Sequence, residues 1–550
     1  MVASRSSAVL VLSSLCMLSA WGIGRSLADE AVSNPADRPK APFKVLYSND
    51  FTNMQSCVSP YHGKRETWSP EMIDGTVEEV ARTGVDVHML QPCTTWVPWW
   101  PSKVYSMEEH HRWWNEYFGI ESSKDQTRIV HPVHRYILDG GDPFGVFLTA
   151  CRRADQKAFI SVRLNDGHHL ENVEVPKNTS GIHTISKFYA EHPEYRIGPK
   201  LGNWDQHVHN WAIPEARAHK LALIRELCEM YDMDGLELDF MRHTSYFRLD
   251  ETTPAQRCKV ITEFVAEVRR ALDANAPPGK RPWLCARVPG LVSWHDRLGI
   301  DLVALYEAGL DMVNVSSYYF TQQHHDLAEI RKLVPRAAVY LEMCHCTMTG
   351  QAMGPGRGDI RQFTRTTDQQ FYTTAHVAYR RGADGVSLFN FVYYREHGHP
   401  DRAPFNEPPF HVLKHLGDPE WLARQPQWYV LAKAWNTPLP KRFERGQTHL
   451  FTLDMAPTEH QKADGLVRLR TAGDSSDCRW SVTINSTALD PAGFVRKPLD
   501  HPYEAGLGEP SQYACFRCPR AAVQDGPNEI AVTLQEGPTT TIECLDLVLP

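Results

Sequence analysis

The stretch Asp234-Gly-Leu-Glu-Leu-Asp-Phe-Met-Arg242 constrains the fold most, because it predicts a β-strand with two acids on one face. Side chains alternate between the two faces of a strand. Glu237 and Asp239 therefore share one face, while the neighbouring leucines share the other. Burying an unpaired carboxylate is costly. Two acids on an otherwise apolar strand therefore predict a polar site at the C-terminal end of a barrel strand.

Short apolar strands alternate with helical segments from Lys44 to about Tyr394. The predicted strands are Lys44–Ser48, Val85–Gln91, Ala158–Leu164, Gly235–Phe240, Trp283–Val288, Met312–Tyr318, Ala338–Met343 and Gly385–Phe391. The clearest predicted helices are Glu71–Thr83, Ile213–Tyr231, Pro254–Asn275, His324–Val334 and Asp368–Arg381. This alternation predicts an α/β protein with a (β/α)8 TIM barrel over residues 42–436. An open doubly wound sheet is the alternative, but the chain has no Gly-rich dinucleotide loop to support it.

Two insertions interrupt the alternation, Thr94–Gly141 after the second strand and Asp166–Trp211 after the third. They are rich in tryptophan and histidine. Long loops at the C-terminal ends of barrel strands are usually functional, so we expect both to lie over the active face.

The pattern changes near the C-terminus. A short helix over Gln427–Trp435 is predicted to close the barrel. Residues 440–550 then form short alternating runs separated by Gly and Pro turns, which predicts a small C-terminal β-sandwich. Its clearest strands are Leu466–Arg470, Trp480–Ile484, Glu529–Leu534 and Thr541–Leu549.

The N-terminus is typical of a secretory signal peptide. Arg5 precedes an apolar run from Ala8 to about Ile23, and Ser26 and Ala28 are small residues at the cleavage positions. We expect removal of residues 1–28 and a secreted or periplasmic protein. The alternative is an uncleaved anchor, although the run is short for a membrane span. We expect no integral membrane segment after removal of the signal.

The net charge is −8 over 550 residues, and the sequence contains no block of basic residues. Both observations argue against a nucleic-acid partner. Export permits disulfides, and four cysteines lie close together near the C-terminus, so a bridge is expected among them. They are Cys478, Cys515, Cys518 and Cys544.

The acids are typical of glycoside hydrolysis, which needs two carboxyl groups flanking the scissile bond. Asp239 and Glu342 are predicted to be the catalytic pair, with Glu237 in reserve, because the fourth and seventh strands lie across the barrel mouth from each other. Each acid has a structural alternative. Arg163 and Arg287 have the strand parity to point inward, where either could pair with these acids.

Other polar and aromatic residues are predicted to bind the sugar, through hydrogen bonds to hydroxyl groups or stacking on sugar rings. These residues are His88, Trp96, Asn165, Asp166, Arg242, Asn314, Tyr318, Asn390 and Tyr393. The histidines of the second insertion, with His243, offer a metal-dependent hydrolase as an alternative. No His-x-His pair ends the first strand, so the main prediction includes no metal and no cofactor.

At Asp234–Arg242 the chain resembles the glycosyl hydrolase-like 10 group of (β/α)8 proteins, and the phrase Asn210-Trp-Ala-Ile-Pro214 before a helix is also similar. The resemblance covers roughly Lys44 to Tyr394 and implies a secreted or envelope glycoside hydrolase centred on Asp239 and perhaps Glu237. The chain departs from the group's pattern after Arg242, where His243-Thr244 replaces a common Tyr-Pro. The last 110 or so residues resemble a carbohydrate-binding or galactose-binding-like sandwich.

The sequence therefore predicts a secreted glycoside hydrolase that cleaves a polysaccharide or oligosaccharide with paired carboxylates. Two alternatives stay open: a metal-dependent hydrolase that uses loop histidines, and a carbohydrate-binding barrel without catalysis.

Overall fold

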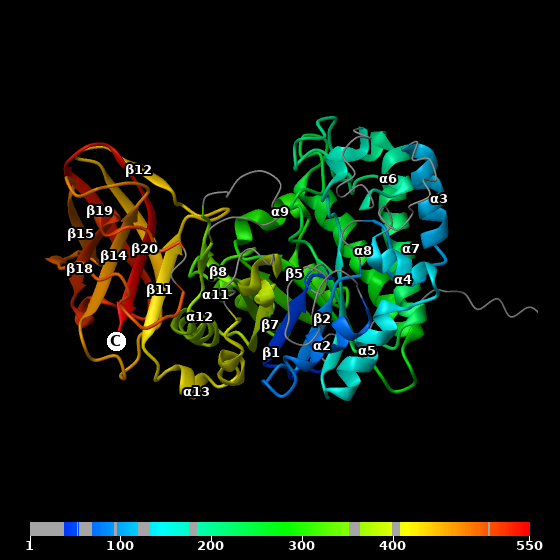
Figure 1. Ribbon diagram of the computed structural model, residues 1–550, viewed down its shortest axis with the longest axis horizontal. Coiled ribbons are helices and arrows are strands. Elements are labelled where there is room, and N and C mark those ends of the chain that lie inside the picture. The colour runs from blue at the N-terminus through cyan, green and yellow to red at the C-terminus, as the bar shows by residue number, and fades with distance from the viewer. Residues whose placement is uncertain are drawn as a thin grey trace, which may run out of the picture.

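The eight predicted strands close into a parallel barrel. The computed structural model describes residues 38–51, 53, 69–92, 96–118, 131–174, 184–350, 363–398, 407–503 and 506–550. The barrel strands are β1 (Val45–Asn49), β2 (Val87–Leu90), β3 (Lys157–Arg163), β4 (Gly235–Asp239), β5 (Trp283–Pro289), β6 (Met312–Ser316), β7 (Ala338–Cys344) and β10 (Gly385–Phe389). Parallel pairing of β1 with β10 closes the ring, which confirms the predicted fold. Figure 1 labels β1, β2, β5 and β7 of this barrel.

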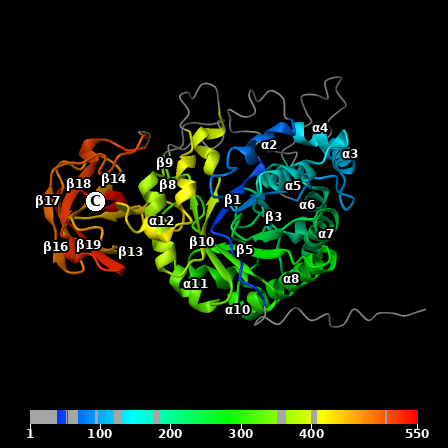
Figure 2. The same ribbon diagram turned by 90° about the horizontal axis from the view of Figure 1, so that it is seen from below.

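Helices surround the strands, as Figure 2 shows for α7, α8, α10, α11 and α12. The helices are α2 (Glu71–Glu78), α3 (Met107–Tyr117), α4 (Pro132–Leu138), α5 (Pro143–Arg153), α6 (Lys187–Glu191), α7 (Pro214–Met230), α8 (Pro254–Asn275), α9 (His295–Leu298), α10 (Leu302–Glu307), α11 (Leu327–Leu333), α12 (Asp368–Arg380) and α13 (Pro419–Leu422). All five predicted helices form. The predicted insertions contain α3, α4, α6 and the 3-10 turn η3 (Leu170–Glu174).

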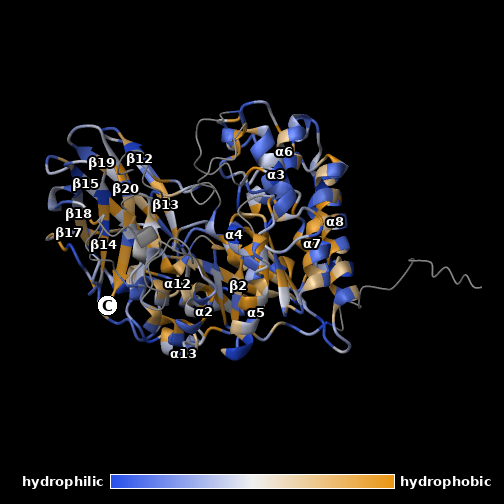
Figure 3. Ribbon diagram, turned by 45° about the vertical axis from the view of Figure 1, so that its right-hand side comes forward, coloured by the Kyte–Doolittle hydropathy of each residue, from blue (hydrophilic) through white to orange (hydrophobic). Residues whose placement is uncertain are grey.

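The side chains of β4 alternate between the two faces of the barrel wall as predicted. Leu236 and Leu238 pack in the hydrophobic core between the strands and the helices. Glu237 and Asp239 point into the barrel, where they contact residues of β3, β5 and β6. Below them a smaller apolar cluster, which includes Leu46 and Met312, fills the barrel interior. Figure 3 shows the resulting pattern, with hydrophobic strands and helices such as α7 and α8 that are mixed in hydropathy.

The C-terminal region is a sandwich of two antiparallel sheets, as predicted. One sheet has the order β11-β20-β14-β18-β17, with β12 on β20, and the other has the order β13-β19-β15-β16. The strands are β11 (Gln427–Ala432), β12 (Lys441–Phe443), β13 (Thr448–Met455), β14 (Gly465–Thr471), β15 (Arg479–Ile484), β16 (Thr487–Ala488), β17 (Asp490–Ala492), β18 (Tyr513–Cys518), β19 (Gly526–Glu536) and β20 (Thr540–Leu549). A second hydrophobic core lies between the sheets.

The predicted helix over Gln427–Trp435 is wrong, because Gln427–Ala432 form β11 and no helix follows it up to Trp435. Its side chains alternate: Tyr429 and Leu431 enter the sandwich core, while Trp428 and Val430 join a cluster on the opposite face. This period of two favours a strand when both faces are buried. The sandwich therefore begins at Gln427, on the side that faces the barrel (Figure 1).

The expected disulfide near the C-terminus is also wrong, because all four cysteines there are free thiols. The strand register explains this, since Cys515 lies opposite Arg468, Cys518 opposite Gly465 and Cys544 opposite Arg470.

The predicted signal peptide, residues 1–28, lies outside the described residues. None of the described helices is both long and apolar enough to span a membrane.

Candidate active site

The predicted catalytic carboxylates Asp239 and Glu342 lie inside the barrel and share one arginine. Arg287, on β5, donates to the two oxygens of Asp239 at 3.2 and 3.1 Å, and to those of Glu342 at 2.6 and 2.7 Å. All three side chains are buried. Ser316 Oγ donates a further hydrogen bond to Glu342 (2.5 Å). The structure therefore brings the two acids together through a cation that contacts both.

Glu237 lies deeper in the barrel, as its position on β4 predicts. Its carboxyl accepts hydrogen bonds from Ser161 Oγ (2.7 Å) and Asn314 Nδ2 (3.0 Å). Burial, together with the nearby charge of Asp239, raises the pKa of Glu237 to about 7. Burial also raises the pKa of Glu342, and the Arg287 charge opposes only part of that effect. At neutral pH Glu237 is therefore partly protonated, although it lies beneath the acids that flank Arg287.

A second arginine organises the ends of β1 and β3. Arg163 donates to Asp50 and, at 2.7 Å, to Asp166. Asn390 Nδ2 donates to the other oxygen of Asp50 (3.0 Å). Burial alone would raise the pKa of Asp166, but His168 and Arg163 hold it well below its ordinary value. Asp166 is therefore an ionised carboxylate with several fixed partners.

A cavity of about 570 Å³ opens over this end of the barrel. Its walls come from the second insertion, which follows β3, from the segments after β4 and β6, from Phe363 and from the segment after β11. Asp239, Glu342 and Glu237 are not among its lining residues. The ionisable side chains that line it are those of His168, His169, Glu171, Asp205, Arg242, His243, Tyr318 and Tyr319.

One wall of the cavity is a chain of hydrogen bonds from Asp166 to Tyr319. His168 Nδ1 donates to Asp166 Oδ1 (2.5 Å), and His168 Nε2 accepts from Arg242 (2.7 Å). Arg242 also donates to the Tyr319 hydroxyl (2.6 Å). Burial lowers the pKa of His168; the Asp166 carboxylate opposes this effect, and the nearby charge of Arg242 adds to it. His168 is therefore neutral at physiological pH, with both ring nitrogens occupied.

Asp166, His168 and His243 could hold a metal ion by their spacing, since one ligand atom from each lies within 4.8 Å of the others. Their lone pairs, however, already accept hydrogen bonds. The backbone N–H of Gly167 donates to His243 Nδ1 (3.0 Å), and the backbone N–H of His168 donates to Asp166 Oδ1 (2.9 Å). These hydrogen bonds, together with the nearby charges of Arg163 and Arg242, disfavour a cation.

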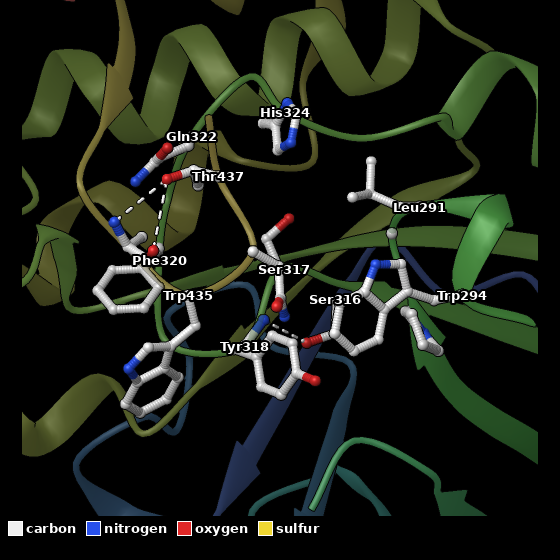
Figure 4. A pocket seen from close by; sticks show the side chains of 14 residues that line it. Leu291, Trp294, Ser316, Ser317, Tyr318, Phe320, Gln322, His324, Trp435 and Thr437 are labelled. Atoms are coloured by element: carbon white, nitrogen blue, oxygen red, sulfur yellow. Dashed lines mark hydrogen bonds between the residues drawn. The ribbon is translucent and has the colours of Figure 1, made fainter. Parts of the chain in front are cut away.

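Two exposed tryptophans face the cavity. Trp204 is 52% exposed, and its ring stacks on His243 with centroids 4.4 Å apart and planes 1° apart. Trp435 is 40% exposed and meets Tyr318 and Tyr319 edge to face. Figure 4 shows Trp435 and Tyr318 close together, where they also border a smaller neighbouring pocket that contains Trp294. The cavity therefore has flat apolar faces beside its polar wall.

The backbone is strained at the same end of the barrel. His169, His243 and Tyr318, which line the cavity, have φ angles of 65°, 58° and 60°, and Asn390, directly after β10, has a φ angle of 50°. Such left-handed conformations cost about 1–3 kcal/mol for residues other than glycine, and residues held in them tend to cluster at functional sites. Four of them at the ends of β3, β4, β6 and β10 therefore point to a site at this end.

Two of the predicted substrate-binding residues, Arg242 and Tyr318, line the cavity. Asp166 and Asn390 hold the polar network beneath it. Asn314 contacts Glu237, and Asn165 bonds the backbone oxygens of His209 and Ser245 at 2.9 and 2.7 Å. The buried ring of Tyr393 meets His345 edge to face.

The predicted sugar-binding roles of His88 and Trp96 do not agree with where the structure places these side chains. His88 faces the helices, where its ring packs between Tyr47 and Phe147, because on β2 the inward positions belong to its two neighbours. Trp96 is fully buried between His209 and Lys220, in the layer formed by the insertions. Neither residue lines the cavity.

Several residues that line the cavity have no site role predicted from the sequence, among them Glu171, Trp204, Asp205, Tyr319 and Trp435. The first three lie in the second insertion, which was expected to cover the active face. Trp435 could not be placed, because its segment was interpreted as a barrel helix.

Comparisons with known proteins give only distant likenesses. No protein-family model matches the chain, and no curated protein matches it. Among solved structures, an α-L-fucosidase from Paenibacillus thiaminolyticus is 11% identical, with 90% of this chain and 97% of that chain covered and a TM-score of 0.34. A β-galactosidase from the psychrophilic Marinomonas ef1 is 11% identical, with coverage of 69% and 60% and a TM-score of 0.40.

A GH138 enzyme targeting pectin rhamnogalacturonan II is also 11% identical, with a TM-score of 0.37. The match covers 70% of this chain but only 39% of that enzyme's length. At such values these likenesses carry no argument about activity, and the barrel is established by its own strand pairing.

Proposed function

We propose that this protein is a glycoside hydrolase that binds its carbohydrate substrate in the cavity over the C-terminal ends of the barrel strands. The observation that carries the proposal is the pair of exposed tryptophans, Trp204 and Trp435, on the walls of one polar cavity. Exposed aromatic faces that gather on one cavity are typical of a ligand-binding site, and sugar rings offer apolar faces with hydroxyl edges.

The position of the cavity supports the proposal. TIM-barrel enzymes hold their active sites at the C-terminal ends of the strands. The left-handed residues His169, His243 and Tyr318 all lie on the cavity wall, where strain is a frequent feature of functional sites.

The catalytic acids have two sets of candidates. Asp239 and Glu342 stay the predicted pair, but both carboxylates contact Arg287 and lie below the cavity lining. Glu171 and Asp205 line the cavity itself, and Glu171 has one buried carboxylate oxygen without a hydrogen-bond partner among the described residues. Glycosidases need one carboxyl group on each side of the scissile bond, and each set supplies two carboxyl groups.

A second function, a carbohydrate-binding barrel without turnover, is favoured by one observation. Arg287 donates hydrogen bonds to both predicted catalytic acids. A carboxylate held in two hydrogen bonds to an arginine is a weak acid catalyst and a weak nucleophile. This function would keep sugar binding and lack hydrolysis.

The test is a screen of oligosaccharides and polysaccharides with the purified protein, in which new reducing ends report hydrolysis and calorimetry reports binding. We expect hydrolysis of at least one substrate, and a loss of binding of about tenfold or more in Trp204→Ala and Trp435→Ala. Phe494→Ala is the matched control, since Phe494 is 44% exposed and does not line the cavity. Binding without hydrolysis would favour the second function. A protein that neither binds nor hydrolyses any of these carbohydrates would refute both functions.

Four isosteric variants then separate the acids. Loss of turnover in Glu171→Gln and Asp205→Asn would assign catalysis to the cavity lining, whereas loss in Asp239→Asn and Glu342→Gln with native stability would assign it to the acids on Arg287.

We also propose that the protein is exported, on the strength of the charged and apolar N-terminal segment. N-terminal sequencing of the mature protein should begin at Asp29. A mature protein that retains residues 1–28 would contradict export by a cleaved signal.

A further inference from the structure

Three arginines lie at the mouth of the barrel, and two of them each form ion pairs with two carboxylates. Arg163 contacts the carboxylates of Asp50 and Asp166. Arg287 contacts those of Asp239 and Glu342. Each of these two arginines therefore holds a pair of acids in place and has no role as a free cation.

Arg242 differs from the other two. Its hydrogen-bond partners are both neutral: the hydroxyl of Tyr319 and Nε2 of His168. No carboxylate of the described residues forms an ion pair with it, and its Nε has no hydrogen-bond partner among them. A guanidinium carries five N–H hydrogens, so several remain available after these two bonds.

Arg242 keeps its charge despite this lack of direct partners. Burial by itself would lower the pKa of Arg242, but Tyr319 and, from a distance, Asp50 and Asp166 outweigh it and the pKa is raised. Both of those aspartates are in contact with Arg163 instead. Arg242 is also the one arginine or lysine among the described residues that line the cavity. A charged group with unused donors therefore faces the space proposed to hold the substrate.

We propose that the carbohydrate bound in this cavity carries an anionic group, a carboxylate or a sulfate ester, which pairs with Arg242. The inference rests on the proposed function, because it names the class of sugar for that site. Planar guanidinium donors match the oxygens of both groups.

The acids of the cavity sharpen the expected position of that group. Glu171 and Asp205 lie on the same lining and would repel an anion. Asp205 also accepts a hydrogen bond from Ser245 (2.6 Å), which fixes its carboxylate. The anionic group must therefore lie at the wall formed by Arg242 and Tyr319, and neutral parts of the sugar must face the two acids.

The experiment uses the full-length protein and matched ligands. A panel of hexuronate oligosaccharides of the common linkages is compared with the same oligosaccharides after reduction of each carboxyl to a primary alcohol, and with neutral oligosaccharides that carry sulfate esters. Calorimetry measures the affinity for each. For wild type we expect about 10- to 100-fold tighter binding of the charged member of a pair, as for a hydrogen-bonded charge contact. The preferred charged series then identifies the carboxylate or the sulfate.

Variants locate the effect. Arg242→Gln should lose the preference, whereas Arg242→Lys should keep part of it and show a stronger dependence on salt. Arg225→Gln is the control, because it removes the same charge from α7, where Arg225 pairs with Glu267 on the surface. The wild-type comparison needs no variant, so misfolding of Arg242→Gln would leave the test intact.

Each outcome has one meaning. Equal or weaker binding of the charged members, or an unchanged preference in Arg242→Gln with native stability, overturns the inference while sugar binding still supports the proposed function. Failure to bind any sugar, charged or neutral, refutes the proposed function itself.

Discussion

Glu237 should make the protein less stable as the pH rises toward neutrality. Its pKa is about 7 in the folded protein, against an ordinary value of 4.5. Between these values the folded state binds more protons than the unfolded state, so the free energy of unfolding falls with rising pH. Each pKa unit corresponds to about 1.4 kcal/mol, so the group should cost about 3 kcal/mol once the pH exceeds 7. Below pH 4.5 it should cost nothing.

Glu237→Gln isolates this effect, because the amide has the shape of the protonated acid. It can donate to Ser161 Oγ and accept from Asn314 Nδ2, which now contact the carboxyl together with the Cys285 thiol. We expect the variant to gain about 3 kcal/mol relative to wild type between pH 4.5 and 8. Urea unfolding at pH 4.5, 6, 7 and 8 measures the difference, with Glu307→Gln, an exposed site on α10, as the control. A difference that does not change with pH would refute the reasoning.

Three further predictions follow from the same contacts. Arg287→Met should lower the free energy of unfolding at pH 7 by about 3–5 kcal/mol, because it leaves Asp239 and Glu342 buried without a counter-charge; urea unfolding that matches wild type would contradict this. Gln323→Leu should cost about 1–3 kcal/mol in the same assay, because the Val430 N–H loses its acceptor at 2.7 Å. Dialysis against EDTA should leave any hydrolysis unchanged, since the lone pairs around Asp166 already accept hydrogen bonds; a tenfold loss that zinc restores would reverse this view.

The sequence was sufficient for features that depend on local periodicity. The alternation of Glu237 and Asp239 with the neighbouring leucines gave the correct inward face of β4, and the parity of Arg163 and Arg287 gave two inward cations. The alternation of side chains along a strand does not show whether a given acid contacts an arginine or a substrate, because that depends on contacts across several strands.

Parity failed where both faces of a strand are apolar. His88 is flanked by Val87 and Met89, so nothing local tells which face is inside. The same ambiguity affects β11, whose continuous apolar run fits a buried helix as well as a strand. The cavity itself joins segments far apart in the chain, from Glu171 to Trp435, and only the folded chain brings them together.

The position of β11 has a consequence for biosynthesis. Trp435 lies shortly after the end of β11 at Ala432, and β11 is anchored to the barrel by Gln322 and Gln323, which accept from its backbone. Its partner within the sheet is β20, which the ribosome makes after every other strand of the sandwich. A nascent chain with a finished barrel would thus carry Trp204 but still lack the strand that pairs with β11, and the segment that holds Trp435 would be complete only when β20 has emerged.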